Sequence, residues 1–126
     1  KLFRQVIINI AQNAFYAVKA KFPGCTEENT NSQEMPGIVI FKTTIIEDNF
    51  VISISDNGIG MDSETVGRIF EPYFTTKANG TGLGMTMSYK IIKEFGGDIQ
   101  VKSEKGTGSV FFISLPVPQT ETKLLG

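Results

Sequence analysis

The sequence predicts an α+β fold, a two-layer α/β sandwich in which helices cover one face of a mixed, mostly antiparallel sheet. Two observations lead to this expectation. Residues 2–20 carry apolar side chains at helical spacing, and residues 38–55 and 98–115 each read as two alternating segments joined by a short turn. With 126 residues the chain is expected to form one domain over residues 1–118, followed by a flexible tail over 119–126.

The first helix, expected over residues 2–20, carries two stripes of side chains. The apolar stripe consists of Phe3, Val6, Ile7, Ile10, Ala14 and Val18. The polar stripe stacks three amides at intervals of four residues, those of Gln5, Asn9 and Asn13. A solvated helix face is one explanation of the polar stripe. The functional alternative is that the Asn13 carboxamide oxygen supplies a neutral, hard ligand to a magnesium ion that phosphates mostly hold.

Four strands are expected as two hairpins. The first pair covers residues 38–47 and 50–55 around the turn Asp48-Asn49, and the second covers residues 98–104 and 109–115 around residues 105–108. Sequential hairpins of this kind pair antiparallel, which is why the sheet is expected to be mostly antiparallel.

The first strand pair leads into Ser-Asp-Asn-Gly-Ile-Gly-Met at residues 55–61. Gly58 and Gly60 would let a flat ligand approach the backbone, and Asp56 would accept a hydrogen bond from an exocyclic amine such as that of adenine. The alternative is ordinary turn chemistry, in which an Asp caps the helix that begins near Asp62. The motif alone leaves both explanations open.

Two further segments are expected to be loops. Residues 22–37 are polar and predict a mobile surface loop, while residues 75–84 carry alternate glycines at Gly80, Gly82 and Gly84. This second cluster lacks the spacing of the dinucleotide-binding motif and of the P-loop. It precedes a helix expected over residues 85–95 and ended by Gly96-Gly97. The unpaired N–H groups at the start of that helix would bind phosphates well. A flexible loop before an ordinary amphipathic helix is the alternative. A short helix over residues 63–69 is expected before this loop.

Composition excludes several classes of function. Twelve basic and thirteen acidic side chains give a net charge of -1 with no basic stripe, so no nucleic-acid partner is expected. The absence of histidine excludes histidine-based catalysis and His-ligated zinc within this chain. The single Cys25 fits a reducing compartment, and the cytoplasm is the default expectation. No run approaches the about 20 apolar residues of a membrane span, so no membrane contact is expected. The chain starts at Lys1 in mid-pattern, which suggests a piece of something longer.

Taken together, these motifs resemble the ATP-binding catalytic domain of histidine kinases, within the gyrase, heat-shock chaperone, histidine kinase and mismatch-repair superfamily. The resemblance covers residues 3–116 and rests on the Asn-rich helix, the Asp-x-Gly-x-Gly turn, the aromatic segment 70–74 and the Gly-x-Gly-x-Gly loop. It implies a domain that binds ATP and magnesium beneath a mobile ATP lid.

The resemblance also implies roles for particular residues. Asn13 would bind magnesium, with Asn9 one turn earlier contacting phosphate or ordered water. Asp56 would bind the adenine amine directly and through a water also held by Ser109. Lys77, in a lid that runs from Phe70 to Gly80, would reach the terminal phosphate. The catalytic residues implied are Asn9, Asn13 and Lys77, with Asn13 as the metal ligand, and the ATP-binding residues implied are Asn9, Asn13, Tyr16, Ala17, Asp56, Gly58, Ile59, Gly60, Met61, Ile69, Phe70, Phe74, Lys77, Gly80, Thr81, Gly82, Leu83, Gly84, Met85 and Ser109.

The chain departs from the family pattern in three ways. Tyr16 stands where a basic residue is frequent, Asn79 stands where a glycine is frequent, and the strand expected before the first helix is missing. Position 9 favours transfer over hydrolysis. Superfamily members that hydrolyse ATP place a Glu one turn before the magnesium asparagine, and Asn9 cannot act as that base.

The expected function is therefore transfer of the ATP γ-phosphoryl group to a histidine on a separate dimerisation and phospho-acceptor domain, and indirectly to a response regulator. An isolated domain of this kind is expected to be monomeric and cytoplasmic, with a parent protein that is either soluble or membrane-anchored. Two alternatives stay open: a serine kinase of the anti-sigma type, and a module that binds ATP without transferring it, which Tyr16 weakly favours.

Overall fold

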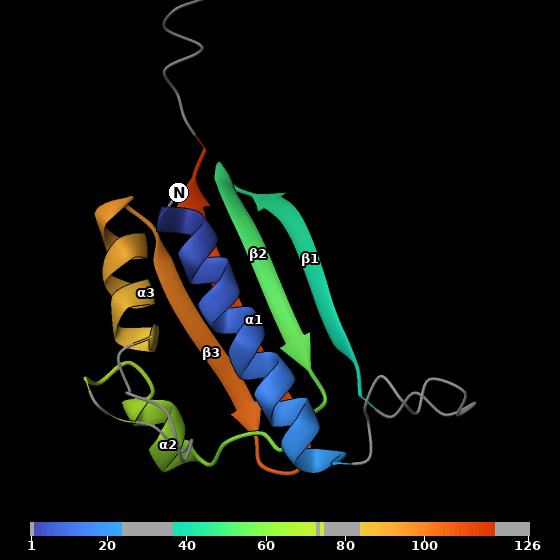
Figure 1. Ribbon diagram of the computed structural model, residues 1–126. Helices are drawn as coiled ribbons and strands as arrows, with labels where there is room; N and C mark the ends of the chain where they lie inside the picture. Colours follow the sequence, from blue (N-terminus) through green and yellow to red (C-terminus); the bar gives the residue numbers. More distant parts are fainter. Residues whose placement is uncertain (1, 24–36, 73, 75–83, 118–126) are drawn as a thin grey trace, which may run out of the picture.

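The computed structural model describes residues 2–23, 37–72, 74 and 84–117, which form a four-stranded sheet with helices packed on one face (Figure 1). This confirms the predicted two-layer α+β arrangement. The elements in chain order are α1 (Leu2–Lys21), β1 (Val39–Ile46), β2 (Asn49–Asp56), α2 (Ser63–Arg68), α3 (Gly84–Glu94), β3 (Asp98–Glu104) and β4 (Gly108–Pro116). Most of the predicted loop 22–37 and of the glycine loop 75–84 lies outside the described residues, as does the whole of the predicted tail 119–126.

The sheet has the strand order β1-β2-β4-β3, and every neighbouring pair is antiparallel. The two hairpins β1-β2 and β3-β4 join through their second strands. The described strands therefore contain no parallel pair, although a mixed, mostly antiparallel sheet was expected. The reason is that each hairpin is antiparallel by construction and that β2 and β4 also run in opposite directions where they pair.

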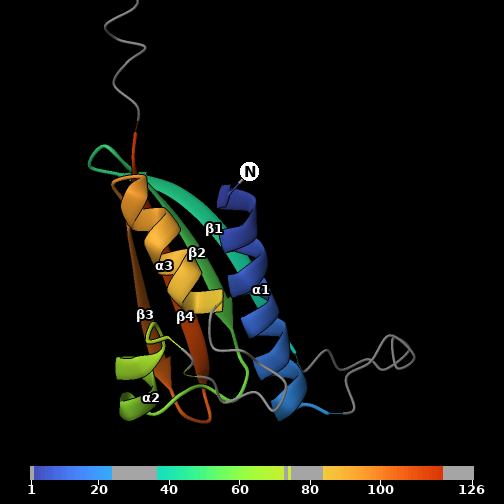
Figure 2. The ribbon, with the colours of Figure 1, turned by 60° about the vertical axis from the view of Figure 1, so that its left-hand side comes forward.

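Helices α1 and α3 lie side by side on the same face of the sheet, as the two views in Figures 1 and 2 both show. The apolar stripe of α1 faces inward, since Val6 and Ile10 are 0% exposed and Ala14 is 2% exposed. No described helix is long and apolar enough to cross a membrane. The buried core between the two layers consists of Val6, Ile10, Ala14, Ile54, Met85, Ile91, Ile92, Ile99, Phe111 and Ile113.

The turn between β1 and β2 consists of Glu47 and Asp48, which both have positive φ angles, 47° and 65°. The predicted turn Asp48-Asn49 was therefore wrong by one residue, because Asn49 already pairs with Ile46 in the sheet. Two positive φ angles are typical of a type I′ turn, whose twist matches that of the flanking strands. The register that results points Ile54 into the core, where it is fully buried.

Helix α3 ends in a glycine cap, as predicted. Gly96 has a φ of 79°, its N–H donates to the Lys93 carbonyl at 3.0 Å, and the N–H of Gly97 donates to the Ile92 carbonyl at 2.9 Å. These two bonds satisfy carbonyls that the last turn of a helix leaves unpaired. The short helix α2 is capped by Asp62, whose carboxylate accepts the N–H of Thr65 at 2.8 Å.

Candidate functional site

Asp56 is the last residue of β2 and lies opposite Ser109 of β4 in the sheet register. Its Oδ1 atom accepts the N–H of Gly58 at 2.9 Å. Burial raises the pKa of Asp56 above its ordinary value, and backbone hydrogen bonds from Gly58 and Ser109 oppose that rise. The ionised carboxylate is therefore incompletely compensated by the protein, so a ligand that donates a hydrogen bond to it would bind favourably.

The loop after Asp56 packs tightly against α1 and against the β3-β4 hairpin. The N–H of Ile59 donates to the Ala17 carbonyl at 3.1 Å, and a Cβ atom on Gly58 would collide with the Ala17 backbone. Gly60 has a φ of 67°, and a Cβ atom there would collide with the Glu104 carbonyl. The two glycines are thus required by the packing of the protein itself, a reason that ligand access alone did not suggest.

The polar stripe of α1 faces helix α3. The Nε2 atom of Gln5 donates to Asn9 Oδ1 at 2.9 Å, and Asn9 Nδ2 donates to the Gly84 carbonyl at 3.3 Å and to Ser88 Oγ at 3.1 Å. Asn9 therefore holds the first turns of α3 against α1. Asn13 is half-buried on the same face of α1, one turn further along.

The predicted apolar lining comes from several elements. Met61, Ile69 and Phe70 are half-buried and pack against the core, and Met85 is buried in the first turn of α3. Phe70 is held in two ways: its carbonyl accepts the hydroxyl of Thr86 at 3.0 Å, and its ring lies 5.2 Å from that of Tyr89. The Phe74 ring lies under the Arg68 guanidinium, 4.6 Å away.

The remaining predicted residues fall into two groups. Tyr16 and Ile59 are exposed, at 39% and 37%. Five residues of the predicted lid and glycine loop lie outside the described residues, namely Lys77, Gly80, Thr81, Gly82 and Leu83. The described parts of the predicted site meet at one end of the sheet, where the end of β2, the Asn-bearing face of α1 and the start of α3 converge.

Two serines that the sequence analysis missed take part in this arrangement. Ser88 is fully buried and accepts the bond from Asn9. Ser103 Oγ accepts the N–H of Met61 at 2.7 Å and lies 2.7 Å from Ser109 Oγ. A usable signal was the alternation along the third strand, because Ser103 follows Ile99 and Val101 at the inward-facing positions, where an apolar residue is the ordinary choice.

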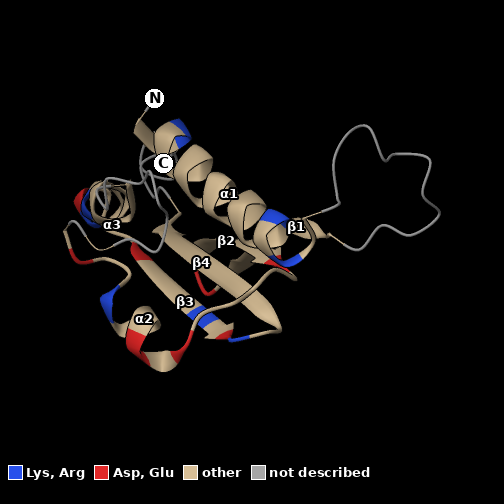
Figure 3. Ribbon diagram, turned by 60° about the horizontal axis from the view of Figure 1, so that its bottom comes forward, with Lys and Arg blue, Asp and Glu red and all other residues tan. Residues whose placement is uncertain are grey.

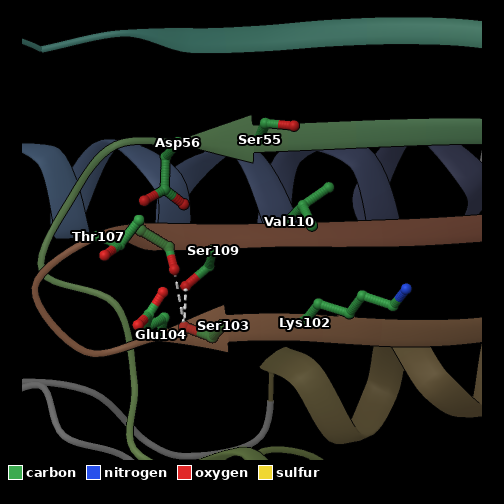
Figure 4. Close-up of a pocket in the computed structure, with 9 residues that line it drawn as sticks. Ser55, Asp56, Lys102, Ser103, Glu104, Thr107, Ser109 and Val110 are labelled. Carbon is green, nitrogen blue, oxygen red and sulfur yellow. Dashed lines mark hydrogen bonds between the residues drawn. The ribbon is translucent and has the colours of Figure 1, made fainter.

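A hollow of about 420 Å³ lies at the same end of the sheet and is shown in Figure 4. Alternation along the strands directs Ser55, Lys102 and Val110 toward the face that α1 and α3 leave uncovered. Asp56, Ser103 and Ser109 also line the hollow, so it borders part of the predicted site, although most of it lies on the side of the sheet away from Asn9 and Asn13. Figure 3 shows basic and acidic residues interspersed around α2 and β3 at this end.

The half-buried carboxylate at the end of β2 and the amide-bearing face of α1 are the features of this fold that could bind a nucleotide. The family model described as "Histidine kinase-, DNA gyrase B-, and HSP90-like ATPase" matches residues 1–119, and the chain belongs to this family. The predicted family is thereby confirmed.

Known relatives agree with this assignment. The chain is 44% identical over 119 residues to sporulation kinase E of Bacillus subtilis, covering 92% of this chain and 14% of that protein. It is 40% identical to the signal transduction histidine-protein kinase AtoS of Escherichia coli, covering 93% of this chain and 17% of that protein. The chain thus spans less than a fifth of the length of these two relatives.

Solved structures agree as well. The nucleotide-free catalytic domain of the histidine kinase ThkA is 31% identical, with a TM-score of 0.70, over 93% of this chain and 69% of that one. Full-length ShkA in complex with AMPPNP is 26% identical, with a TM-score of 0.71, over 91% of this chain and 21% of that one. The chain is an ATP-binding catalytic domain of the sensor histidine kinase type.

Proposed function

We propose that the parent protein transfers the γ-phosphoryl group of ATP, with magnesium, to a histidine on a separate dimerisation and phospho-acceptor domain. From that histidine the phosphoryl group would pass to a response regulator in the cytoplasm. The chain contains no histidine, so the acceptor must be supplied by another segment or subunit. Two findings support this proposal. Relatives of this chain are named histidine kinases, and this chain matches only a small part of such a relative, which leaves most of its length for other domains.

The observation that carries the proposal is the hydrogen bonding of Asn9 to Gly84 and Ser88. It brings the amide stripe of α1 to the N-terminus of α3, whose unpaired N–H groups and dipole favour negatively charged phosphates. Asp56, at the end of the adjacent strand β2, would then hold the adenine end of the same nucleotide. The bound ATP would lie with its base at Asp56 and its phosphates between α1 and α3.

Adenine recognition is assigned to Asp56 and its surroundings. The carboxylate would accept the N6 amine, with Ser109 holding a shared water. Gly58 and Gly60 would border the ring edge, while Met61, Ile69 and Met85 would cover the apolar ring from the core side. These last three side chains already pack on the hydrophobic core, which supports their role as a preformed floor.

Magnesium binding is assigned to Asn13. Among the described residues, no three of His, Cys, Asp and Glu come together in a way that could hold a metal ion. A single amide oxygen fits a magnesium ion that keeps phosphate and water oxygens as its other ligands. Bound there, magnesium supplies charge neutralisation on the transferred phosphoryl group. The residues of this chain bind and orient the nucleotide. Lys77 and the glycine loop, outside the described residues, stay predicted partners of the phosphates.

Transfer is favoured over hydrolysis by the chemistry at position 9. Asn9 has no basic lone pair with which to deprotonate an attacking water, and its amide donors are engaged by Gly84 and Ser88. Phosphoryl transfer depends mainly on positioning and electrostatics, and a neutral imidazole on the acceptor is already a nucleophile. Asn9 thus acts by holding α3 in place.

The test is phosphotransfer from labelled ATP to a separately supplied phospho-acceptor domain of the parent, with magnesium titrated. Asn13→Ala is expected to keep ATP binding without magnesium and to lose magnesium-dependent transfer. Gln12→Ala is the matched control, since Gln12 is an exposed neighbour on the same helix and should leave transfer unchanged. Transfer by Asn13→Ala at the wild-type rate and magnesium dependence would contradict the assignment.

A further inference from the structure

The hydroxyl of Ser103 lies at the end of β3 among three polar neighbours. Its Oγ atom accepts the N–H of Met61 at 2.7 Å, lies 3.0 Å from the Gly108 carbonyl oxygen and lies 2.7 Å from Ser109 Oγ. Figure 4 shows the Ser103 and Ser109 side chains meeting between β3 and β4. Ser103 thus joins the loop that follows Asp56 to the serine that pairs with Asp56 across the sheet.

The chemistry of the neighbours limits where the hydroxyl protons lie. A backbone N–H can only donate and a carbonyl oxygen can only accept. The single proton of Ser103 therefore goes either to Gly108, in which case Ser109 donates to Ser103, or to Ser109, which leaves the proton of Ser109 for another partner. The Ser103–Ser109 contact is a hydrogen bond in both arrangements, whereas the Ser103 hydroxyl donates to the Gly108 carbonyl only in the first.

The second arrangement is the one that suits an adenine base. The Watson–Crick edge of adenine presents a donor, the N6 amine, beside an acceptor, N1. If Asp56 accepts from N6, a water between Asp56 and N1 uses both of its hydrogens on these two acceptors. Its oxygen then needs a donor, and the Ser109 hydroxyl can supply one only if it does not donate to Ser103.

We propose that Ser103 is a positioning residue for adenine recognition, which donates its own proton to Ser109 and thereby directs the Ser109 proton to the water at adenine N1. The N–H of Met61 donates to Ser103 and completes this series of hydrogen bonds. The inference rests on the proposed binding of ATP at Asp56. Ser103 would contact neither the base nor the phosphates. It would act by fixing the direction in which the Ser109 hydroxyl donates.

The test compares ATP with 1-deaza-ATP, in which C–H replaces N1 and the amine is kept. Calorimetry of the wild-type chain is expected to show about tenfold preference for ATP, the usual effect of one hydrogen bond to a neutral group. Ser103→Ala is expected to lower that preference to about threefold or less. In a Ser109→Ala background, Ser103→Ala should not change the preference for ATP over 1-deaza-ATP any further, because the hydroxyl that Ser103 orients is already absent. Partial unfolding of a variant cancels in this ratio, since it weakens both ligands alike.

Two controls sharpen the experiment. Ser103→Thr keeps the hydroxyl and should restore the preference, and Ser53→Ala removes a serine from the uncovered face of the sheet and should leave it unchanged. The inference would be overturned if Ser103→Ala kept the wild-type preference for ATP over 1-deaza-ATP. It would also be overturned if Ser103→Ala lowered that preference equally with and without Ser109. Either result would leave the proposed nucleotide site intact. Absence of ATP binding by the wild-type chain would instead overturn the proposed function, and this inference with it.

Discussion

Replacing Asp56 by Asn is expected to weaken ATP binding and to stabilise the free protein. The two side chains have the same shape, and an Asn oxygen can still accept the Gly58 N–H that Asp56 Oδ1 accepts at 2.9 Å. The substitution removes the negative charge and replaces the other oxygen by an NH₂ group. That group would face the adenine amine donor to donor.

The loss of affinity follows from these two changes. A hydrogen bond to a charged group contributes about 1.5–3 kcal/mol, and an unpaired desolvated donor costs about 1–3 kcal/mol more. A micromolar complex of about -8 kcal/mol would therefore weaken to between about -5.5 and -2 kcal/mol, or a Kd of roughly 0.1 mM or weaker. Calorimetric titration with ATP, with and without magnesium, should give a micromolar Kd for the wild type and binding weaker by about 70-fold or more for Asp56→Asn.

Stability should change in the opposite direction. Burial raises the pKa of Asp56 above its ordinary value of 3.8. At pH values between the unfolded and the folded pKa, the folded chain therefore binds more protons than the unfolded chain. The stability contribution of Asp56 therefore falls as the pH rises from 3.8 through the folded pKa. Without ligand, Asp56→Asn should melt above the wild type at pH 7, and the difference should shrink as the pH falls toward 4.

Either measurement can refute the reasoning. Near-normal ATP affinity in Asp56→Asn would remove the adenine assignment, and a lower melting temperature at pH 7 would show that burial is not what dominates the energy of this carboxylate. Asp48→Asn provides the control for the same chemical change, because Asp48 is exposed in the β1-β2 turn, where its positive φ suits Asn. Asp48→Asn should leave the ATP affinity unchanged both with and without magnesium.

Two pairs of variants test the packing around the site by urea unfolding. Gly108→Ala combines a φ of 138° with a collision against the Asp56 carbonyl, so it should cost about 2–5 kcal/mol, whereas Gly67→Ala in α2 meets nothing within 4 Å and should stabilise by about 0.5–1 kcal/mol. Ile10→Ala empties a fully buried position and should cost about 2–5 kcal/mol, against less than about 1 kcal/mol for Ile8→Ala, whose side chain is 39% exposed. Equal losses within either pair would contradict the packing described.

The elements that depend on neighbouring residues were predictable. Helix α1 was expected over residues 2–20 and extends to Lys21, and β3 was expected at its observed bounds, because periodicity along a short stretch already encodes which face is buried. The cap at Gly96 and Gly97 was recognisable for the same reason. The turn at Glu47 and Asp48 was misplaced by one residue, because the pairing of β2 with two other strands sets the register as much as the turn residues do.

The contacts that assemble the site were decided by tertiary structure. The sequence by itself determined the elements, the glycine-flanked Asp56, the amide stripe of α1 and the resemblance to an ATP-binding family. It did not determine that Asn9 would bind Gly84 and Ser88, or that Ser103 would bind Ser109 and the loop at Met61. The Asn9 and Met61 contacts form only because helices and strands pack together, and hydrogen bonds between residues some 40 to 80 positions apart leave no periodic pattern in the chain. The Ser103–Ser109 contact is local, but it depends on the register of the β3-β4 hairpin.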